Sequence, residues 1–489
     1  MNRLISFFIR LGTFIISFWV IATCATAQVF DYVIAQDGSG DYTTFDLALG
    51  RIPINQTERT LIFVKSGVYE EKVNFYSALK NYSLIGDTNG QVIIRWGDYS
   101  GDSEGHTTAS SYTFETSADE FYVENITFEN NAGAVGQAVA VSATGEHQIF
   151  KNCRFLGFQD TYYIRKGIQF NLDCYIEGAT DFIFGESTAV FQNCEIRCLN
   201  GGQYITAPAD TKLITDVEGN DFYHGTLFLN SQILAGTGVG SNSYYLGRPW
   251  QPNASSVYIN CTYGDHIRDE GWSTWTGDNH LTGFFAEYNN QELSGTPVDV
   301  SARVDWSVQL DQQEVEDHYN LDYFLDGWDP LPLTQTLATP ENLQRNIEED
   351  EFFELTWDEV TGARGYVISK NDTAIGFTEG LSFIDGSSDA GDLYQVRSVS
   401  QTGALSGYSN EVEGVKVVLG FDHEIGLTIQ GRMIQSIEPM EVNIYSVSGQ
   451  LICHNERIRS VDMSDFRSGV YIVHLMDAEN RLKVVKVAL

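Results

Sequence analysis

The chain has 489 residues and a formal net charge of −37, from 29 basic and 66 acidic side chains. This charge excludes nucleic acid and anionic membrane surfaces as partners, because both would be repelled. Glycine is abundant, with 45 residues, whereas proline is scarce, with 9, and aromatic residues reach 13%. The length is too great for one ordinary core, and the composition favours short strands and turns. We therefore expect an all-β protein of several domains.

Residues 1–27 have the pattern of a signal peptide. Arg3 and Arg10 precede an apolar segment from Leu11 to Ala22. Ala25-Thr26-Ala27 has the small residues of a cleavage site. The apolar run is shorter than the roughly 20 residues that a membrane-spanning helix needs. We expect the mature protein to begin near Gln28 and to be secreted or attached to the cell surface.

A short pattern recurs along the first half of the chain, in which apolar residues precede Asn or Asp and a small residue follows. A short capping helix is expected just before it, over 44–49. The Asn or Asp recurs at intervals of 20 to 37 residues, at Asn125, Asn152, Asp173, Asn193, Asn230 and Asn260. Each unit is rich in β-branched and aromatic residues, and such periods indicate a solenoid of strands. We predict a right-handed parallel β-helix over 28–332.

In this β-helix, equivalent residues of successive coils stack on one another. Cys153, Cys174 and Cys194 should form one inward ladder. Stacked neighbours lie close enough for a disulfide, but we favour packed free thiols. The two longest intervals predict inserted loops near 208–224 and 235–250, where a cleft wall would be built.

Two small β-sandwich domains are expected after the Pro-containing break at 330–332. Residues 338–415 resemble a fibronectin type III module, with Trp357 in an early strand and Tyr394 at the position of its tyrosine corner. Residues 420–489 resemble the C-terminal sorting domain of Bacteroidota type IX secretion cargo, which implies the type IX secretion machinery as a partner. The alternative is a second small sandwich without a sorting role.

Two aspartates point to a catalytic site. Asp160 and Asp181 stand at the same distance after Asn152 and Asp173, so they occupy the same place on consecutive coils. Their carboxylates would then lie roughly 5 Å apart, and their pKa values would split, leaving one as an acid and the other as a base or nucleophile. Gln159 and Gln137 could supply neutral amide donors to an oxyanion on the same face. Of the aromatic residues around the pair, about half should pack in the core, because alternate strand residues point inward.

Five motifs, in order along the chain, resemble the pectin methylesterase family, carbohydrate esterase family 8. They are GVYEEKV, GQAVAV, GFQDTYY, GATDFIFGES and YLGRPW, and the similarity covers about residues 29–332. The resemblance implies hydrolysis of the C6 methyl esters of homogalacturonan, that is methyl-esterified pectin, with release of methanol. It implies no metal and no cofactor, and we expect a monomeric catalytic domain.

The resemblance also implies a role for each site residue. Asp181 matches the nucleophile, Asp160 the general acid and later base, Gln159 and Gln137 the oxyanion donors, and Arg248 the residue that orients Asp181. Trp250 matches a wall on which sugar stacks, and Phe182, Tyr162 and Tyr163 are expected to contact substrate. Tyr162 replaces the family's usual Leu and Thr180 its usual Val, which bears on substrate preference and removes no catalytic group.

Other functions remain open at the level of sequence. Parallel β-helices also carry pectate lyases and polygalacturonases, but the Gly-His-Gly segment of a polygalacturonase is absent. An esterase or thioesterase of another acyl substrate on the same scaffold, and a pectin-binding or lyase-type β-helix, are the alternatives.

Overall fold

The computed structural model describes most of the chain after the predicted signal peptide. The described residues are 28–87, 92–211, 213–215, 221–347, 353–385, 388–415, 427–430, 433–446, 451–463, 466, 470–477 and 482–488. The signal peptide expected at 1–27 lies outside them. Within these ranges, no helix combines the length and the apolar character needed to cross a membrane.

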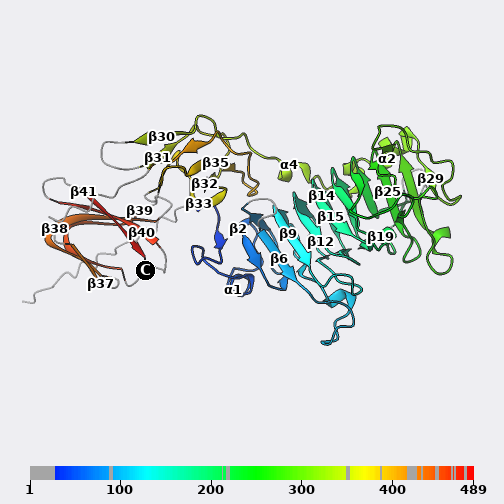
Figure 1. Cartoon of the computed structure of the whole chain (residues 1–489), viewed down its shortest axis with the longest axis horizontal. Coiled ribbons are helices and arrows are strands. Elements are labelled where there is room, and N and C mark those ends of the chain that lie inside the picture. Colours follow the sequence, from blue (N-terminus) through cyan, green and yellow to red (C-terminus); the bar gives the residue numbers. More distant parts are fainter. Residues whose placement is uncertain are drawn as a thin grey trace, which may run out of the picture.

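A right-handed parallel β-helix forms the larger part of the molecule, as predicted (Figure 1). Its strands belong to three parallel sheets, which we call A, B and C. Sheet A contains β1 (Tyr32–Ile34), β2 (Thr60–Val64), β5 (Tyr82–Gly86), β8 (Tyr122–Glu124), β11 (Gln148–Lys151), β14 (Ile168–Leu172), β17 (Thr188–Gln192), β22 (Thr226–Leu229), β25 (Ser255–Ile259), β27 (Phe284–Tyr288) and β29 (Val308–Gln309).

Sheets B and C form the other two sides of the coil. Sheet B contains β3 (Gly67–Tyr69), β6 (Val92–Trp96), β9 (Ile126–Asn130), β12 (Arg154–Leu156), β15 (Tyr175–Gly178), β18 (Glu195–Cys198), β23 (Gln232–Ala235), β26 (Thr262–Tyr263) and β28 (Gln291–Glu292). Sheet C contains β4 (Val73–Phe75), β7 (Phe114–Thr116), β10 (Val141–Ala143), β13 (Tyr162–Ile164), β16 (Thr180–Gly185), β19 (Tyr204–Pro208) and β24 (Tyr245–Gly247).

The recurring Asn or Asp of the sequence pattern marks the corner between sheets A and B. All six residues have a left-handed backbone, with φ between 51° and 63°. Asn and Asp tolerate this conformation better than other residues with a side chain, because their short polar groups can bond locally. The amide of Asn152 donates to Asn125 Oδ1 of the preceding coil at 2.6 Å. The recurring Asn or Asp in the sequence therefore marks the turn between sheets A and B in each coil.

The interior of the β-helix is filled by stacked side chains from successive coils. Cys153, Cys174 and Cys194 are buried and form no disulfide, which agrees with the predicted inward ladder of free thiols. Phe228 stacks on Phe191 and on Tyr258, with ring centroids 4.7 and 4.3 Å apart. Stacking of like side chains at equivalent positions fixes the register of one coil on the next.

The β-helix also contains short elements outside its three sheets. Helix α1 (Phe45–Leu49) begins at Thr44, whose side chain accepts from the Leu47 amide at 3.2 Å, so the predicted capping helix is confirmed. Two 3₁₀ turns, Thr108–Ser110 and Asn279–Leu281, lie in loops. Strands β20 (Leu213–Thr215) and β21 (Asp221–Tyr223) pair as an antiparallel hairpin inside the first predicted insertion.

The outer face of sheet A is apolar and is covered by the chain that leaves the β-helix. This segment contains α2 (Gln312–His318), α3 (Leu321–Phe324) and α4 (Leu331–Thr334). Tyr319, Phe324 and Leu325 pack in one cluster with sheet A residues such as Phe170 and Leu227. A parallel sheet covered on both faces needs apolar residues on both, which explains the nearly continuous apolar strands of sheet A.

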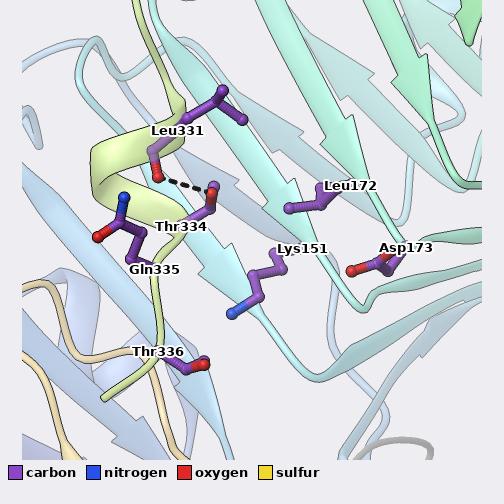
Figure 2. Close-up of a pocket in the computed structure, with 7 residues that line it drawn as sticks. All are labelled: Lys151, Leu172, Asp173, Leu331, Thr334, Gln335 and Thr336. Carbon is purple, nitrogen blue, oxygen red and sulfur yellow. Dashed lines mark hydrogen bonds between the residues drawn. The ribbon is translucent and has the colours of Figure 1, made fainter. Parts of the chain in front are cut away.

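An open hollow of about 740 Å³ remains beside α4, between this covering segment and sheet A. Figure 2 shows Lys151, Leu172 and Asp173 of the β-helix on one side and Leu331, Thr334, Gln335 and Thr336 on the other. The Lys151 ammonium lies 3.4 Å from the buried Glu124 carboxylate, so its charge is already compensated. This hollow lies on sheet A and does not involve Asp160 or Asp181.

A seven-stranded β-sandwich follows within the described residues. One sheet contains β30 (Gln344–Ile347), β31 (Phe353–Thr356) and β34 (Ser382–Ile384), and the other contains β33 (Thr373–Thr378), β32 (Gly365–Lys370), β35 (Leu393–Val399) and β36 (Val412–Glu413). The Tyr394 hydroxyl bonds the Asp385 carboxylate at 2.5 Å. The sandwich is confirmed, whereas its kinship to fibronectin type III stays a prediction.

The sandwich packs against the first coils of the β-helix (Figure 1). The Phe377 ring lies 4.9 Å from the ring of Phe63 on β2. Asp87, at the end of β5, accepts from the Ala374 amide at 3.2 Å, and its carbonyl accepts from Arg397 at 3.1 Å. The sandwich therefore covers the apolar outer face of sheet A at one end, as the covering segment does further along.

The last part of the chain forms an antiparallel sheet. Its strands are β37 (Leu427–Gln430), β38 (Met433–Ser446), β40 (Val470–Met476) and β41 (Leu482–Ala488), with β39 (Leu451–Asp462) paired to β38. Ile444, Val473 and Leu475 belong to the small core on this sheet.

Candidate active site

Asp160 and Asp181 lie one above the other on neighbouring coils, as the sequence predicted. The residues before them, Gln159 and Thr180, form a parallel bridge, and the Asp160 amide donates to the Thr180 carbonyl at 3.1 Å. Neighbouring parallel strands are about 4.8 Å apart, so the two residues are neighbours on the same side of the β-helix. Both residues have a left-handed backbone, with φ of 63° and 50°. Such backbones in residues other than glycine cluster at functional sites.

A β-bulge aims Asp181 outward. The pairing of β16 with β19 shifts register between Thr180 and Ile183. Without the shift, strict alternation from the outward Phe184 would turn Asp181 toward the core. The bulge instead directs the Asp181 side chain into the cavity outside the core and leaves its neighbour Phe182 inside the core.

Arg248 binds Asp181 through two hydrogen bonds. Its Nε donates to Oδ1 at 2.8 Å and its Nη2 to Oδ2 at 2.6 Å. The guanidinium also lies between two rings, 3.7 Å from the centroid of Tyr204 and 3.9 Å from that of Trp275. A bidentate contact between aromatic faces fixes both the position and the plane of the guanidinium, and therefore the orientation of the carboxylate.

The two aspartates have different electrostatic environments. Burial raises the pKa of Asp160 well above its usual range, and the charge of Asp181 raises it further, against the opposing effects of Gln159 and Arg248. Burial also raises the pKa of Asp181, but the hydrogen bonds and charge of Arg248 act against this. These environments favour the neutral form of Asp160 and, through Arg248, the ionised form of Asp181.

A cavity of about 300 Å³ opens over the pair. It is lined by Ser100, Thr107, Thr108, Ala109, Gln137, Asp160, Tyr163, Asp181, Phe184, Ala207, Trp250 and Trp275. Tyr163 and Phe184 stack with ring centroids 4.3 Å apart, and Trp250 meets Phe184 edge-on at 5.9 Å. A carboxylate paired with an arginine, a neighbouring carboxyl group of raised pKa and an amide donor beneath aromatic walls can together attack and cleave an ester.

Two protein-family models match this chain. The model described as Pectinesterase matches residues 31–328, and that of the Secretion system C-terminal sorting domain matches residues 426–488. The chain belongs to the pectinesterase family. The resemblances to this family and to the sorting domain are both confirmed.

Individual relatives agree with this assignment. "Pectinesterase 31" of Arabidopsis thaliana is 37% identical over 294 residues, which are 58% of this chain and 88% of the relative. "Pectinesterase/pectinesterase inhibitor" of Brassica campestris is 36% identical over 284 residues, 56% of this chain and 48% of the relative. This chain thus spans about half the length of that longer relative. The solved "Pectin methylesterase from Carrot" is 31% identical, covers 61% of this chain and 93% of its own, and superposes with a TM-score of 0.55.

The two glutamines expected to serve the family's oxyanion lie on neighbouring coils. Gln137 and Gln159 form a parallel bridge, which places Gln137 one coil before Gln159. Gln137 is exposed and lines the cavity. Gln159 is half-buried and interacts with the Asp160 carboxyl group instead of lining the cavity. In the free protein, therefore, Gln137 alone of the two amides faces the cavity.

Two expected substrate contacts are wrong. Tyr162 and Phe182 are completely buried in the core of the β-helix. Tyr162 alternates with the outward Tyr163 and stacks on Phe155 at 4.6 Å, while the bulge turns Phe182 inward. Neither side chain can touch a ligand in the cavity, whereas Tyr163 and Trp250 do line it.

One wall of the cavity, the loop of residues 97–111, could not be predicted from the sequence. Ser100, Thr107, Thr108 and Ala109 come from it. No repeat or charge pattern identifies this loop in the sequence. Trp275, which lines the cavity, was also not assigned a role from the sequence.

A polar cluster holds this loop in place. His106 Nδ1 lies 2.6 Å from Asp102 Oδ2, its Nε2 lies 3.2 Å from Asp98 Oδ2, and the Lys72 ammonium contacts the same Asp98 oxygen at 2.5 Å. Asp98, Asp102 and His106 offer ligand atoms within 4.8 Å of one another, as a metal site would. Because Lys72 already supplies a cation to Asp98, the cluster is better explained as the anchor of the loop.

Proposed function

We propose that this protein is a pectin methylesterase that hydrolyses the C6 methyl esters of homogalacturonan to methanol and free carboxylates. The observation that carries the proposal is the bidentate ion pair of Arg248 with Asp181, next to Asp160, whose pKa is raised by burial and by the charge of Asp181, in an aromatic cavity. A carboxylate held ionised next to a carboxyl group held neutral is the arrangement that nucleophilic ester cleavage requires.

In the first step, Asp181 attacks the carbonyl carbon of the ester. The negative charge that develops on the carbonyl oxygen is stabilised by amide donors, with Gln137 already facing the cavity and Gln159 beside Asp160. Asp160 donates its proton to the methoxy oxygen as the C–O bond breaks, and methanol leaves. The product is an acyl-enzyme anhydride between Asp181 and the C6 carboxyl group.

In the second step, Asp160 is ionised and accepts a proton from water. The resulting hydroxide attacks the C6 carbonyl of the anhydride, and the bond to Asp181 breaks. Asp181 returns to its ion pair with Arg248, and Asp160 is again protonated. The product is the galacturonic acid unit, which releases one proton to the solvent and becomes a carboxylate, and the enzyme returns to its starting protonation state.

The cavity walls would bind the sugar chain through their aromatic faces. Trp250, Trp275, Tyr163 and Phe184 present rings around the aspartates, and the apolar faces of sugar rings pack on such surfaces. Thr107, Thr108 and Ser100 supply hydroxyl groups from the loop of residues 97–111.

The test compares the unmodified protein with Asp181→Asn and Asp160→Asn on highly methylated pectin. Methanol is measured with alcohol oxidase, and the ends of the polymer are analysed in parallel. We expect methanol from the unmodified protein and losses of at least about a hundredfold in each variant. Full methanol release by Asp181→Asn would refute the mechanism. Unsaturated chain ends would identify a lyase, and hydrolysis of other acyl esters or thioesters without methanol release from pectin would support the alternative esterase.

We also propose how the chain is organised for export. The division is a signal peptide at 1–27, the esterase at 28–332, a sandwich at 338–415 and a sorting domain at 420–489, read by the type IX secretion machinery. The matched sorting-domain model supports this assignment. The enzyme would be secreted or attached to the cell surface and would act as a monomer. Mass spectrometry of the exported protein would reveal both cleavage sites, and retention of a chain truncated after 415 inside the cells would support sorting by the tail.

A further inference from the structure

Arg165 lies on the outer face of sheet C next to the catalytic cavity. It directly follows β13, and its amide donates to the Ala143 carbonyl at 2.8 Å, so it continues the pairing of β13 with β10. Residues two apart on a strand point to the same side. Arg165 therefore projects from the same face as Tyr163, which lines the cavity.

The side chain of Arg165 extends along this face toward the earlier coils. Its guanidinium carbon is 5.7 Å from the centroid of the Tyr163 ring, and its Nη1 is 4.0 Å from Glu115 Oε1 on β7. Ser142 of β10 is paired in register with both Tyr163 and Glu115 and lies between them. Because the Ser142 side chain is small, it leaves room for the Arg165 guanidinium to lie close to the backbone of the sheet.

The guanidinium of Arg165 retains hydrogen-bonding capacity. The Glu115 carboxylate is beyond hydrogen-bonding distance and already accepts from the Asn74 amide at 2.9 Å. The Arg165 side chain is 40% exposed and carries five N–H donors. Arg248, by contrast, is committed to both oxygens of Asp181. Arg165 is thus a cation beside the cavity that can accept an anionic ligand.

We propose that Arg165 binds the free carboxylate of a galacturonate unit near the esterified unit, on the side of the cavity toward β10 and β7. This inference rests on the proposed pectin methylesterase function. Arg forms bidentate contacts with carboxylates, whereas a methyl ester offers no negative charge. With a net charge of −37, the protein repels polygalacturonate at long range. A cation such as Arg165 offsets this repulsion locally, so a free carboxylate binds best at the position next to it. The preferred substrate then carries a free carboxylate at that position, as the enzyme's own product does.

Binding of unmethylated oligogalacturonate, measured by calorimetry, tests the proposal in the full-length protein. We expect Arg165→Gln to weaken binding by about tenfold and Arg165→Lys to retain part of the affinity. Glu115→Gln should strengthen binding, because it removes the anion that competes with the ligand. The opposite signs of these two changes separate carboxylate binding from a general loss of structure.

Arg154→Gln is the matched control. Arg154 lies on sheet B, with its guanidinium 3.9 Å from the ring of Tyr175, and the substitution makes the same change in net charge away from the cavity. We expect it to leave affinity and methanol release unchanged. Equal affinity in Arg165→Gln and the unmodified protein, or equal loss in Arg154→Gln, would overturn the inference. Absence of methanol release by the unmodified protein would instead contradict the proposed function, so the two failures are distinguishable.

Discussion

Arg248 donates to both carboxylate oxygens of Asp181, while the rings of Tyr204 and Trp275 hold its guanidinium from either side. This arrangement counteracts the effect of burial, which raises the pKa of Asp181. Asp181 must be ionised to act as a nucleophile. The ion pair therefore determines how far activity extends toward acidic pH.

Arg248→Gln should shift the pH dependence of the reaction. Without the cation, the neutral form of Asp181 is favoured, so its pKa rises and the acidic limb of the kcat/KM profile moves to higher pH, by about 1 to 3 units. The measurement is methanol release against pH for the variant, with Arg154→Gln as the control. An acidic limb at the same pH in both variants would mean that Arg248 does not set the ionisation of Asp181.

The neighbouring residues Tyr162 and Tyr163 should respond differently to substitution, because they face opposite sides of β13. Tyr162→Phe removes the hydrogen bond between the hydroxyl and Asn171 Oδ1, which is 3.1 Å long and buried. It should lower the free energy of unfolding by about 1 to 3 kcal/mol and leave KM unchanged. Thermal and denaturant unfolding and steady-state kinetics measure both quantities.

Tyr163→Ala should give the reverse result. Its ring lines the cavity and stacks on Phe184, so its loss should raise KM for pectin, with a smaller effect on stability. A rise in KM for Tyr162→Phe equal to that for Tyr163→Ala would contradict the assignment of the two faces.

Periodicity predicted the relationships that repeat from coil to coil. The stacking of Asp160 on Asp181 and the inward cysteine ladder both follow from equivalent positions in consecutive units. The bridge between Gln137 and Gln159 does not, because Gln137 lies 12 residues after Asn125 whereas Gln159 lies 7 residues after Asn152. Periodicity failed where the strand departs from the repeat. The bulge between Thr180 and Ile183 reverses the direction of Phe182, and alternation alone cannot reveal it.

Contacts between segments far apart in the chain could also not be predicted from the sequence. The loop at 97–111 is held beside the cavity by contacts with residues distant in the sequence, such as the ion pair of Lys72 with Asp98 and the hydrogen bond of the Ser100 amide to the Gln137 carbonyl. The sandwich and the segment at 311–334 cover sheet A through apolar residues that look like ordinary core residues in the sequence. Neither relationship has a period or a motif that would identify it.

The buried cysteines should be unreactive in the folded protein. Burial raises the pKa of Cys153, Cys174, Cys198 and Cys261, to about 12 for Cys261, so the reactive thiolate is disfavoured. Cys453 is the partly exposed exception among the described cysteines. A thiol reagent should label Cys453 in the native mature protein and all six cysteines after denaturation, as measured by mass spectrometry. Rapid native labelling of Cys174 would show that the ladder is open to solvent.

His266 should make stability sensitive to acid. It is completely buried, its ring meets Tyr244 edge-on at 5.9 Å, and its carbonyl accepts from the Tyr244 amide at 2.8 Å. Burial lowers its pKa from 6.5 to about 4, although the nearby Asp265 opposes the shift. Tyr244 immediately precedes β24, the strand that leads into Arg248. Charging His266 would therefore disturb the packing that supports the catalytic arginine.

The sign of this effect follows from proton binding. Between pH 6.5 and about 4, the unfolded chain protonates His266 while the folded protein does not, so stability is lost as pH falls through this window. The loss from this residue should reach about 2.5 kcal/mol at pH 4.5. His266→Phe should lack this contribution. Urea unfolding of both proteins at pH 7.5 and pH 4.5 isolates it, because the other titrating groups are common to both. If acidification destabilises the two proteins equally, His266 is not the acid-sensitive group.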